Sequence, residues 1–204
     1  MISIVNYGVG NIGSVVNMLR HIGSPPVIAS TVEEIEAATA LLLPGVGAFG
    51  AAIERLNAQG FSDVLRRRAL EDRIPLLGIC LGMQLLSNGS EEGGAEGLGL
   101  IDADFVKFSF PPGSPLKVPH MGWNTVSVQQ ENPLIDVQGE EQRFYFVHSY
   151  YARCRKEDVI ATSTHGDEFV CAYGRENIMG VQFHPEKSHK FGMRLLENFV
   201  EFAC

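Results

Sequence analysis

Residues 74–84 of the chain have the sequence IPLLGICLGMQ. The apolar first half of this stretch predicts a buried strand, and its end predicts a helix, so Cys80 lies at the turn between them. Gly78 and Gly82 flank the cysteine in a Gly-x-Cys-x-Gly pattern, which indicates a nucleophile elbow with a thiol in place of the usual hydroxyl. The helix N-terminus would favour the reactive thiolate, and the Leu81 N–H could stabilise an oxyanion. The alternative is a buried cysteine packed between glycines in the core.

An activated thiol needs a base, and residues 180–186, with the sequence GVQFHPE, supply a candidate near the end of the chain. Pro185 favours an extended backbone at His184. Residues two apart in an extended chain face the same side, so His184 and Glu186 can point together toward Cys80. Glu186 would then accept the imidazole N–H and stabilise the charged ring. Taken alone, the pair could be a strand-end histidine beside a surface glutamate; with the elbow cysteine, it predicts a Cys-His-Glu triad.

Length and composition exclude several classes of protein. The 204 residues are enough for a single domain, expected over residues 1–204, and no run is long enough to span a membrane. The N-terminus resembles a first strand and lacks the basic region of a secretory signal, so we expect a cytoplasmic protein. A formal net charge of −8 argues against nucleic-acid binding. Cysteines 80, 154, 171 and 204 show no metal-ligand spacing or disulfide framework, so we expect free thiols, no metal site and no cofactor.

The pattern of apolar residues predicts an α/β fold. In the first half, short apolar strands at 2–6, 27–29, 40–43 and before Cys80 alternate with helical segments, the first capped by Asn11 and the second by a Thr31–Glu34 capping box. Further helices are expected at about 48–57 and 62–71. The second half predicts partly antiparallel strands, at 125–128, 143–148, 159–163, 169–173 and 178–183. A last helix over 188–204 carries a stripe predicted to pack in the core: Phe191, Leu195, Phe199 and Phe202. We therefore expect three layers, with a mostly parallel central sheet flanked by helices and an antiparallel extension in the C-terminal half.

Three motifs, LPGVG at 43–47, GICLGMQ at 78–84 and FHPE at 183–186, together resemble those of the class I (triad-type) glutamine amidotransferases. The resemblance covers essentially the whole chain and implies a flavodoxin-like fold and hydrolysis of L-glutamine to glutamate and ammonia through a thioester. Three more stretches narrow it: NYGVGN at 6–11, PHMGWN at 119–124 and VHSY at 147–150. Within the class, these are similar to the glutaminase subunits of imidazole glycerol phosphate synthase, which serve histidine biosynthesis.

The resemblance also implies roles for residues around the triad. It assigns an oxyanion hole to the backbone of Val46, Gly47 and Leu81, and substrate contacts to Gly47, Gln84, Glu92 and Ser149. Gln84 would hold the substrate and Glu92 would pair with its ammonium group. Each of the side chains also has an ordinary explanation, as a helix-surface glutamine, a solvated acidic loop residue and a strand-end serine.

Ammonia is lost to water and to protonation unless it is delivered directly to a second reaction. The resemblance therefore implies a (β/α)8-barrel cyclase subunit as a heterodimer partner, docked over the glutaminase site. Its candidate contacts in this chain are Asn11, Met121, Trp123 and Lys187. A tryptophan beside a methionine suits an interface anchor, although Trp123 could equally be an ordinary core residue.

Several other functions remain open from the sequence. Another amidotransferase of the same class, feeding anthranilate, GMP or pyridoxal phosphate synthesis, would share the triad. A γ-glutamyl hydrolase or a cysteine peptidase on a related fold would act alone. A non-catalytic thiol sensor or binding module would leave His184 and Glu186 without a chemical role.

Overall fold

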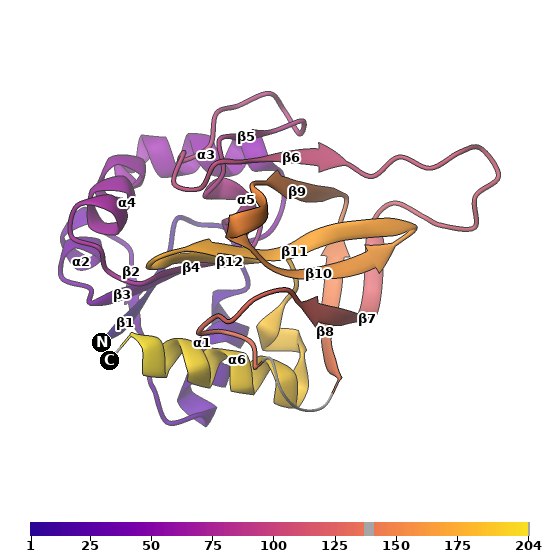
Figure 1. The fold of residues 1–204 in the computed structure, drawn as a ribbon. Helices are drawn as coiled ribbons and strands as arrows, with labels where there is room; N and C mark the ends of the chain where they lie inside the picture. Colours follow the sequence, from indigo (N-terminus) through magenta and orange to yellow (C-terminus); the bar gives the residue numbers. More distant parts are fainter. Residues whose placement is uncertain (137–140, 204) are drawn as a thin grey trace.

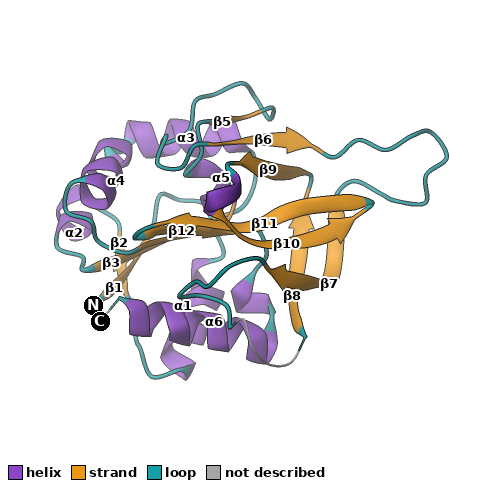
Figure 2. Ribbon diagram, in the orientation of Figure 1, coloured by secondary structure: helices purple, strands orange, loops and turns teal. Residues whose placement is uncertain are grey.

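The computed structural model describes residues 1–136 and 141–203 (Figure 2). The strands are β1 Ile2–Val5, β2 Val27–Ala29, β3 Ala40–Gly45, β4 Leu76–Cys80, β5 Gly89–Ser90, β6 Ala103–Lys107, β7 His120–Val128, β8 Gln142–His148, β9 Tyr150–Cys154, β10 Val159–His165, β11 Asp167–Arg175 and β12 Ile178–Val181. The helices are α1 Ile12–His21, α2 Val32–Glu36, α3 Phe49–Ala58, α4 Phe61–Leu70, α5 Leu81–Leu85 and α6 His189–Phe202, with 3-10 turns η1 Lys156–Asp158 and η2 Pro185–Lys187. No helix of this described part has the length and apolar character needed to cross a membrane.

All the strands of the described residues belong to one sheet, whose main path runs β2-β1-β3-β4-β12-β11-β10-β7-β8. Strands β2, β1, β3, β4 and β12 pair in parallel, and the path from β12 to β8 is antiparallel. Helices α2 to α5 cover one face, and α1 and α6 cover the other (Figure 1). The three layers, the mostly parallel centre and the antiparallel extension that we predicted are confirmed.

The alternation of side chains along the central strands explains the two layers of helices. In β3, Leu41 and Leu43 pack into the core beneath α2 to α5, whereas Ala40 and Leu42 pack into the core beneath α1 and α6. All these side chains are fully buried. A strand that is apolar on both faces needs a helical layer on each side, as parallel sheets generally do.

The structure corrects several local expectations. The Thr31–Glu34 capping box of α2 is formed, but Asn11 makes no side-chain cap for α1. Phe202 is 39% exposed, so the apolar stripe of α6 does not extend to its last turn. Three strands were not predicted: β5, β6 and β9, of which β6 pairs with both of the others beside the main sheet. Cys204 lies outside the described residues.

Glycines of the predicted elbow allow α5 to approach the sheet closely. A Cβ atom on Gly82 would overlap the carbonyl oxygen of Leu43 in β3, and one on Gly78 would lie 2.7 Å from the backbone of Gly82. Backbone atoms on both sides leave no room for relaxation. The spacing of the two glycines therefore allows the helix to begin directly after Cys80.

We predict that Gly82→Ala lowers the free energy of unfolding by about 3 kcal/mol, at the upper end of the usual cost of overpacking, because the added methyl group meets backbone. Urea unfolding followed by circular dichroism measures this. The matched control is Gly13→Ala in α1, where an added Cβ has no atom within 4 Å. Equal stability of the two variants would contradict this account of the elbow.

Candidate active site

The ends of three parallel strands bring the candidate site together. The register pairs Gly45, at the end of β3, with Cys80, at the end of β4. On the other side of β4, Val181, the last residue of β12, pairs with Ile79. The loop after Gly45, the cysteine, and the segment that leads to His184 therefore leave the sheet at the same edge. Ligands of open α/β sheets characteristically bind at this carboxyl edge.

Cys80 adopts the strained backbone of a nucleophile elbow, with φ 54° and ψ −111°. This φ lies in the left-handed region, which costs energy for any residue with a Cβ and is found mainly at functional sites. The cysteine forms the N-cap of α5 and is 7% exposed. Nearby, the buried Tyr7 hydroxyl donates to the Pro44 carbonyl at 3.1 Å. Burial, together with the proximity of Cys80, raises the pKa of Tyr7 well above its ordinary value.

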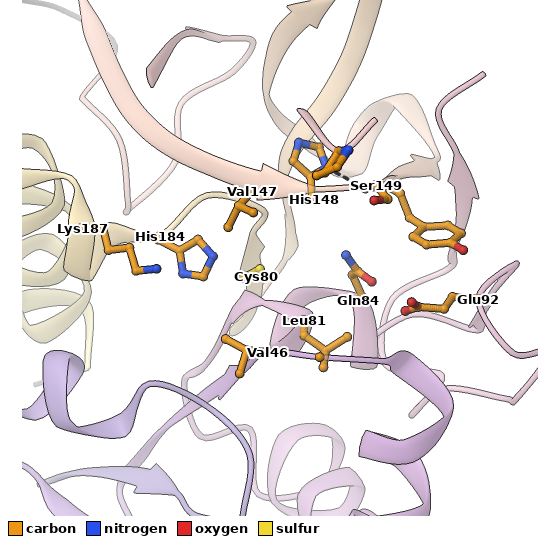
Figure 3. A pocket seen from close by; sticks show the side chains of 13 residues that line it. Val46, Cys80, Leu81, Gln84, Glu92, Val147, His148, Ser149, His184 and Lys187 are labelled. Atoms are coloured by element: carbon orange, nitrogen blue, oxygen red, sulfur yellow. Dashed lines mark hydrogen bonds between the residues drawn. The ribbon is translucent and has the colours of Figure 1, made fainter. Parts of the chain in front are cut away.

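His184 and Glu186 form the predicted pair. The His184 Nδ1 and Glu186 Oε1 atoms are 2.8 Å apart, and both side chains are almost fully buried. The route to this contact differs from the prediction: His184 is extended, but Glu186 lies in the 3-10 turn η2, which folds its carboxylate back onto the ring. The other ring nitrogen, Nε2, is buried and has no hydrogen-bond partner. Figure 3 shows the ring facing Cys80.

The charge state of His184 follows from these neighbours. Burial disfavours the imidazolium, but the interactions of the ring with Cys80 and Glu186 outweigh this cost and raise the pKa of His184 to about 10. An imidazolium beside a sulfur is the arrangement that stabilises a thiolate. The site can therefore hold a nucleophile and a proton donor at the same time.

Gln182 is a site residue that the sequence analysis missed. It is fully buried, and its side-chain amide lies between two pocket residues: Nε2 donates to the Cys80 sulfur at 3.8 Å, and Oε1 accepts from Gln84 Nε2 at 3.1 Å. Gln182 therefore links the Cys80 sulfur to the Gln84 side chain. The only signal in the sequence was its place two residues before His184, which by itself does not indicate that a side chain faces Cys80.

A cavity of about 330 Å³ opens above the cysteine (Figure 3). Its lining comes from six separate parts of the chain: Val46, Gly47, Cys80, Leu81, Gln84, Glu92, Pro119, Val147, His148, Ser149, Tyr150, His184 and Lys187. The lining contains every predicted catalytic, oxyanion and substrate residue except Glu186, which contacts the Nδ1 atom of His184 outside the cavity. Of the predicted interface residues, Lys187 lines the cavity and three do not: Asn11, Met121 and Trp123.

The predicted substrate residues have structural partners as well. One carboxylate oxygen of Glu92 accepts from the Phe49 N–H at 2.9 Å and so caps α3, which has no cap of its own. Gln84 is 5% exposed and joins the Gln182 amide. The Ser149 carbonyl accepts from the Phe108 N–H at 3.0 Å. These contacts fix the side of the pocket opposite His184.

The other described thiols lie outside the cavity and are free. Burial, with the charges of Asp158 and Glu157, raises the pKa of Cys154 to about 11. Within residues 1–136 and 141–203, no group of three or more His, Cys, Asp or Glu side chains is arranged to hold a metal ion.

Comparison with known proteins identifies the class that this fold and site define. The family model of the class I glutamine amidotransferases matches residues 3–202, and the chain belongs to that family. A crystal structure of a glutamine amidotransferase has the same fold, with a TM-score of 0.77 at 21% identity, covering 99% of this chain and 98% of that one.

Closer relatives identify the branch. The chain is 50% identical to imidazole glycerol phosphate synthase subunit HisH 2 of Methanococcus maripaludis and 49% identical to the subunit of that name from Pseudomonas aeruginosa, over 204 residues and the full length of each. These relatives confirm the function predicted from the sequence, that of an imidazole glycerol phosphate synthase glutaminase subunit.

We predict that His184 of the free protein titrates with a midpoint of about 10. Nuclear magnetic resonance of the labelled ring measures this, with His184→Gln for assignment. Cys80→Ala removes the interaction of the ring with the sulfur, leaves the one with Glu186, and should lower the midpoint of the His184 titration. Since folding raises the pKa of His184, protonation of this ring stabilises the folded protein. This stabilisation is complete below the ordinary pKa of 6.5 and is lost as the pH rises toward 10. A wild-type midpoint at or below 6.5 would contradict the assigned charge state.

Proposed function

We propose that Cys80, His184 and Glu186 hydrolyse L-glutamine within one amidotransferase domain formed by residues 1–204. The Cys80 sulfur forms a bond to the side-chain amide carbon, and the carbonyl electron pair moves onto the oxygen. Leu81 N–H and an N–H of the Val46–Gly47 segment stabilise this oxyanion, each by about 3 kcal/mol.

His184 then completes the reaction as acid and base. Its imidazolium gives a proton to the amide nitrogen, the carbon–nitrogen bond breaks, and ammonia leaves a glutamyl thioester on Cys80. A water molecule gives a proton to the neutral ring and attacks the thioester. The carbon–sulfur bond breaks, glutamate leaves, and the sulfur and ring return to their starting charges. Glu186 holds the ring in one tautomer and stabilises its charged form throughout.

The observation that carries this proposal is the placement of His184 with Nε2 unpartnered and facing the sulfur of a strained cysteine, while Nδ1 is held by a buried carboxylate. The strained backbone and the raised pKa of His184 would serve no purpose in a merely structural cysteine–histidine contact. They also argue against a non-catalytic thiol sensor, in which Glu186 would be idle.

Substrate recognition uses the other side of the cavity. We assign the Glu92 carboxylate oxygen that does not bind the Phe49 N–H to the ammonium group of the substrate. The Gln84 side chain and the Gly47 and Ser149 segments would bind the remaining polar groups of the substrate. All four residues line the same cavity as Cys80. A cavity of about 330 Å³ is the size that a small-molecule site requires.

Ammonia delivery requires a partner, and we propose a (β/α)8-barrel cyclase subunit that covers the cavity mouth in the cytoplasm. Met121 is 62% exposed and pairs across the sheet with Val147, a cavity residue. Trp123 is 42% exposed, and the Lys187 Nζ atom lies 5.7 Å from the centre of the Tyr145 ring beside it. Apolar exposed side chains next to a polar cavity suit a protein interface. We place Asn11 at the same interface.

The reaction is tested by the release of glutamate and ammonia from glutamine, measured on the chain together with its cyclase subunit. We predict that Cys80→Ala abolishes turnover and that His184→Ala lowers kcat by about a thousandfold, since the acid and base are lost. The matched control is Cys154→Ala, because Cys154 lies outside the cavity. Turnover retained by Cys80→Ala, or lost only in Cys154→Ala, would refute the assignment.

The interface is tested separately by calorimetric titration of the cyclase subunit. We predict that Trp123→Ala weakens binding by about thirtyfold, the effect typical of an aromatic anchor. Leu70→Ala is the control, because Leu70 is 54% exposed but ends α4 and does not line the cavity. Equal affinities of the two variants would show that Trp123 is not an anchor.

A further inference from the structure

Two buried histidines that take no part in the reaction above lie at the substrate side of the cavity, one in its lining and one behind it. His120 begins β7 and His148 ends β8, and the antiparallel register places them opposite each other. They are 6% and 5% exposed. His120 does not line the cavity, whereas His148 does. Neither was assigned a role from the sequence.

Hydrogen bonds fix the position of every proton in this pair. The Thr164 carbonyl can only accept, so the atom of Asn124 that lies 2.8 Å from it is the Nδ2 donor. The same Nδ2 lies 3.1 Å from His120 Nε2, which must therefore accept. His120 Nδ1 then carries the proton and donates to His148 Nε2 at 2.9 Å.

This chain of hydrogen bonds ends at a second carbonyl. Since His148 Nε2 accepts, its Nδ1 carries the proton and donates to the Tyr150 carbonyl at 2.7 Å (Figure 3). The hydrogen-bond chain thus runs in one direction, from Asn124 through both rings to Tyr150. A backbone carbonyl, of Thr164 at one end and of Tyr150 at the other, fixes each end. A second proton on either ring would bring two N–H groups together or remove an acceptor, so both histidines must be neutral.

The surroundings agree with neutral rings. Phe108 and Phe169 pack edge-on against both histidines or at a tilt, and a third ring, His165, stacks on His120 with centroids 4.4 Å apart. Burial, and to a lesser extent His165, lowers the pKa of His120 to about 4. Burial lowers the pKa of His148 to about 3, although the bond to Tyr150 opposes the shift. The rings therefore stay neutral at physiological pH.

The last bond of the chain spans Ser149. His148 and Tyr150 lie on either side of it, so the bond from the His148 ring to the Tyr150 carbonyl closes a short loop around this residue. Ser149 connects β8 to β9 and lines the cavity with both neighbours. The bond therefore constrains the backbone of a junction that lines the cavity.

We propose that Asn124, His120 and His148 form a positioning chain that holds Ser149 and Tyr150 in the geometry needed to bind glutamine. The inference rests on the proposed function, since it concerns the same substrate site. His120 acts only through His148 and is a positioning residue. Its effect should fall on KM, because the chain touches the substrate side of the cavity and does not reach Cys80 or His184.

The test compares glutamine kinetics of His120→Phe and His120→Asn with the wild type, each with its cyclase subunit. His120→Phe keeps the ring but removes the donor to His148, and should raise KM about fivefold, the effect of one lost hydrogen bond, with kcat little changed. His120→Asn retains an N–H near the Nδ1 position and should recover most of the loss. His165→Phe is the matched control, because His165 stacks in the same cluster but bonds outside the chain, to the Lys117 carbonyl.

Nitrogen chemical shifts of the labelled histidines provide the second readout. The proposed hydrogen-bond chain requires His120 and His148 of the wild type to be neutral and protonated at Nδ1, whereas free neutral histidine prefers the tautomer protonated at Nε2. His120→Phe should release His148 from this tautomer, and His165→Phe should not. Nε2–H rings in the wild type, or an unchanged KM in a folded His120→Phe variant, would overturn the proposal. A wild-type complex with Nδ1–H rings and no glutaminase activity would instead refute the proposed function.

Discussion

The pairing of β4 with β3 on one side and β12 on the other is the constraint on which the rest of the site depends. Gly45 lies beside Cys80, and Val181 lies beside Ile79, so the carboxyl ends of three strands meet at one edge. A shift of the register by one residue would reverse the face of each side chain. Backbone pairing of these strands thus positions the Val46–Gly47 segment, Cys80 and the segment that leads to His184. The glycines of the elbow then let α5 begin at Cys80 without an intervening loop.

The histidines show how one residue type serves two purposes within a single cavity. His184 and His148 both line it and both are buried. His184 has a carboxylate and a sulfur as neighbours, and its pKa rises to about 10; His148 has carbonyl and aromatic neighbours, and its pKa falls to about 3. His184 is therefore favoured in its protonated form, whereas the Tyr150 carbonyl fixes the proton of the neutral His148 ring at Nδ1. The difference lies in the partners, since burial acts on both in the same direction.

Local sequence patterns were sufficient for the parts of the fold and site that depend on neighbours along the chain. The elbow around Cys80, the pairing of His184 with Glu186 and the alternation of strands and helices could all be predicted in this way. The Gln182 contact with Cys80 and the pairing of His120 with His148 could not, because each depends on which strands lie side by side. Phe202 fits the spacing of the apolar stripe, but it lies in the last turn of α6 and is exposed, so it does not pack in the core as predicted.

We propose that Cys80 is the nucleophile and that His184 activates it at a site shaped for glutamine. The most direct measurement is intact-protein mass spectrometry after incubation with a glutamine analogue whose side-chain amide is replaced by a diazoketone, followed by peptide mapping. We expect a single label on Cys80, which excess glutamine blocks and which His184→Ala slows strongly. Labelling at Cys154 or Cys171, or labelling of Cys80 that is unaffected by glutamine and by the loss of His184, would contradict it.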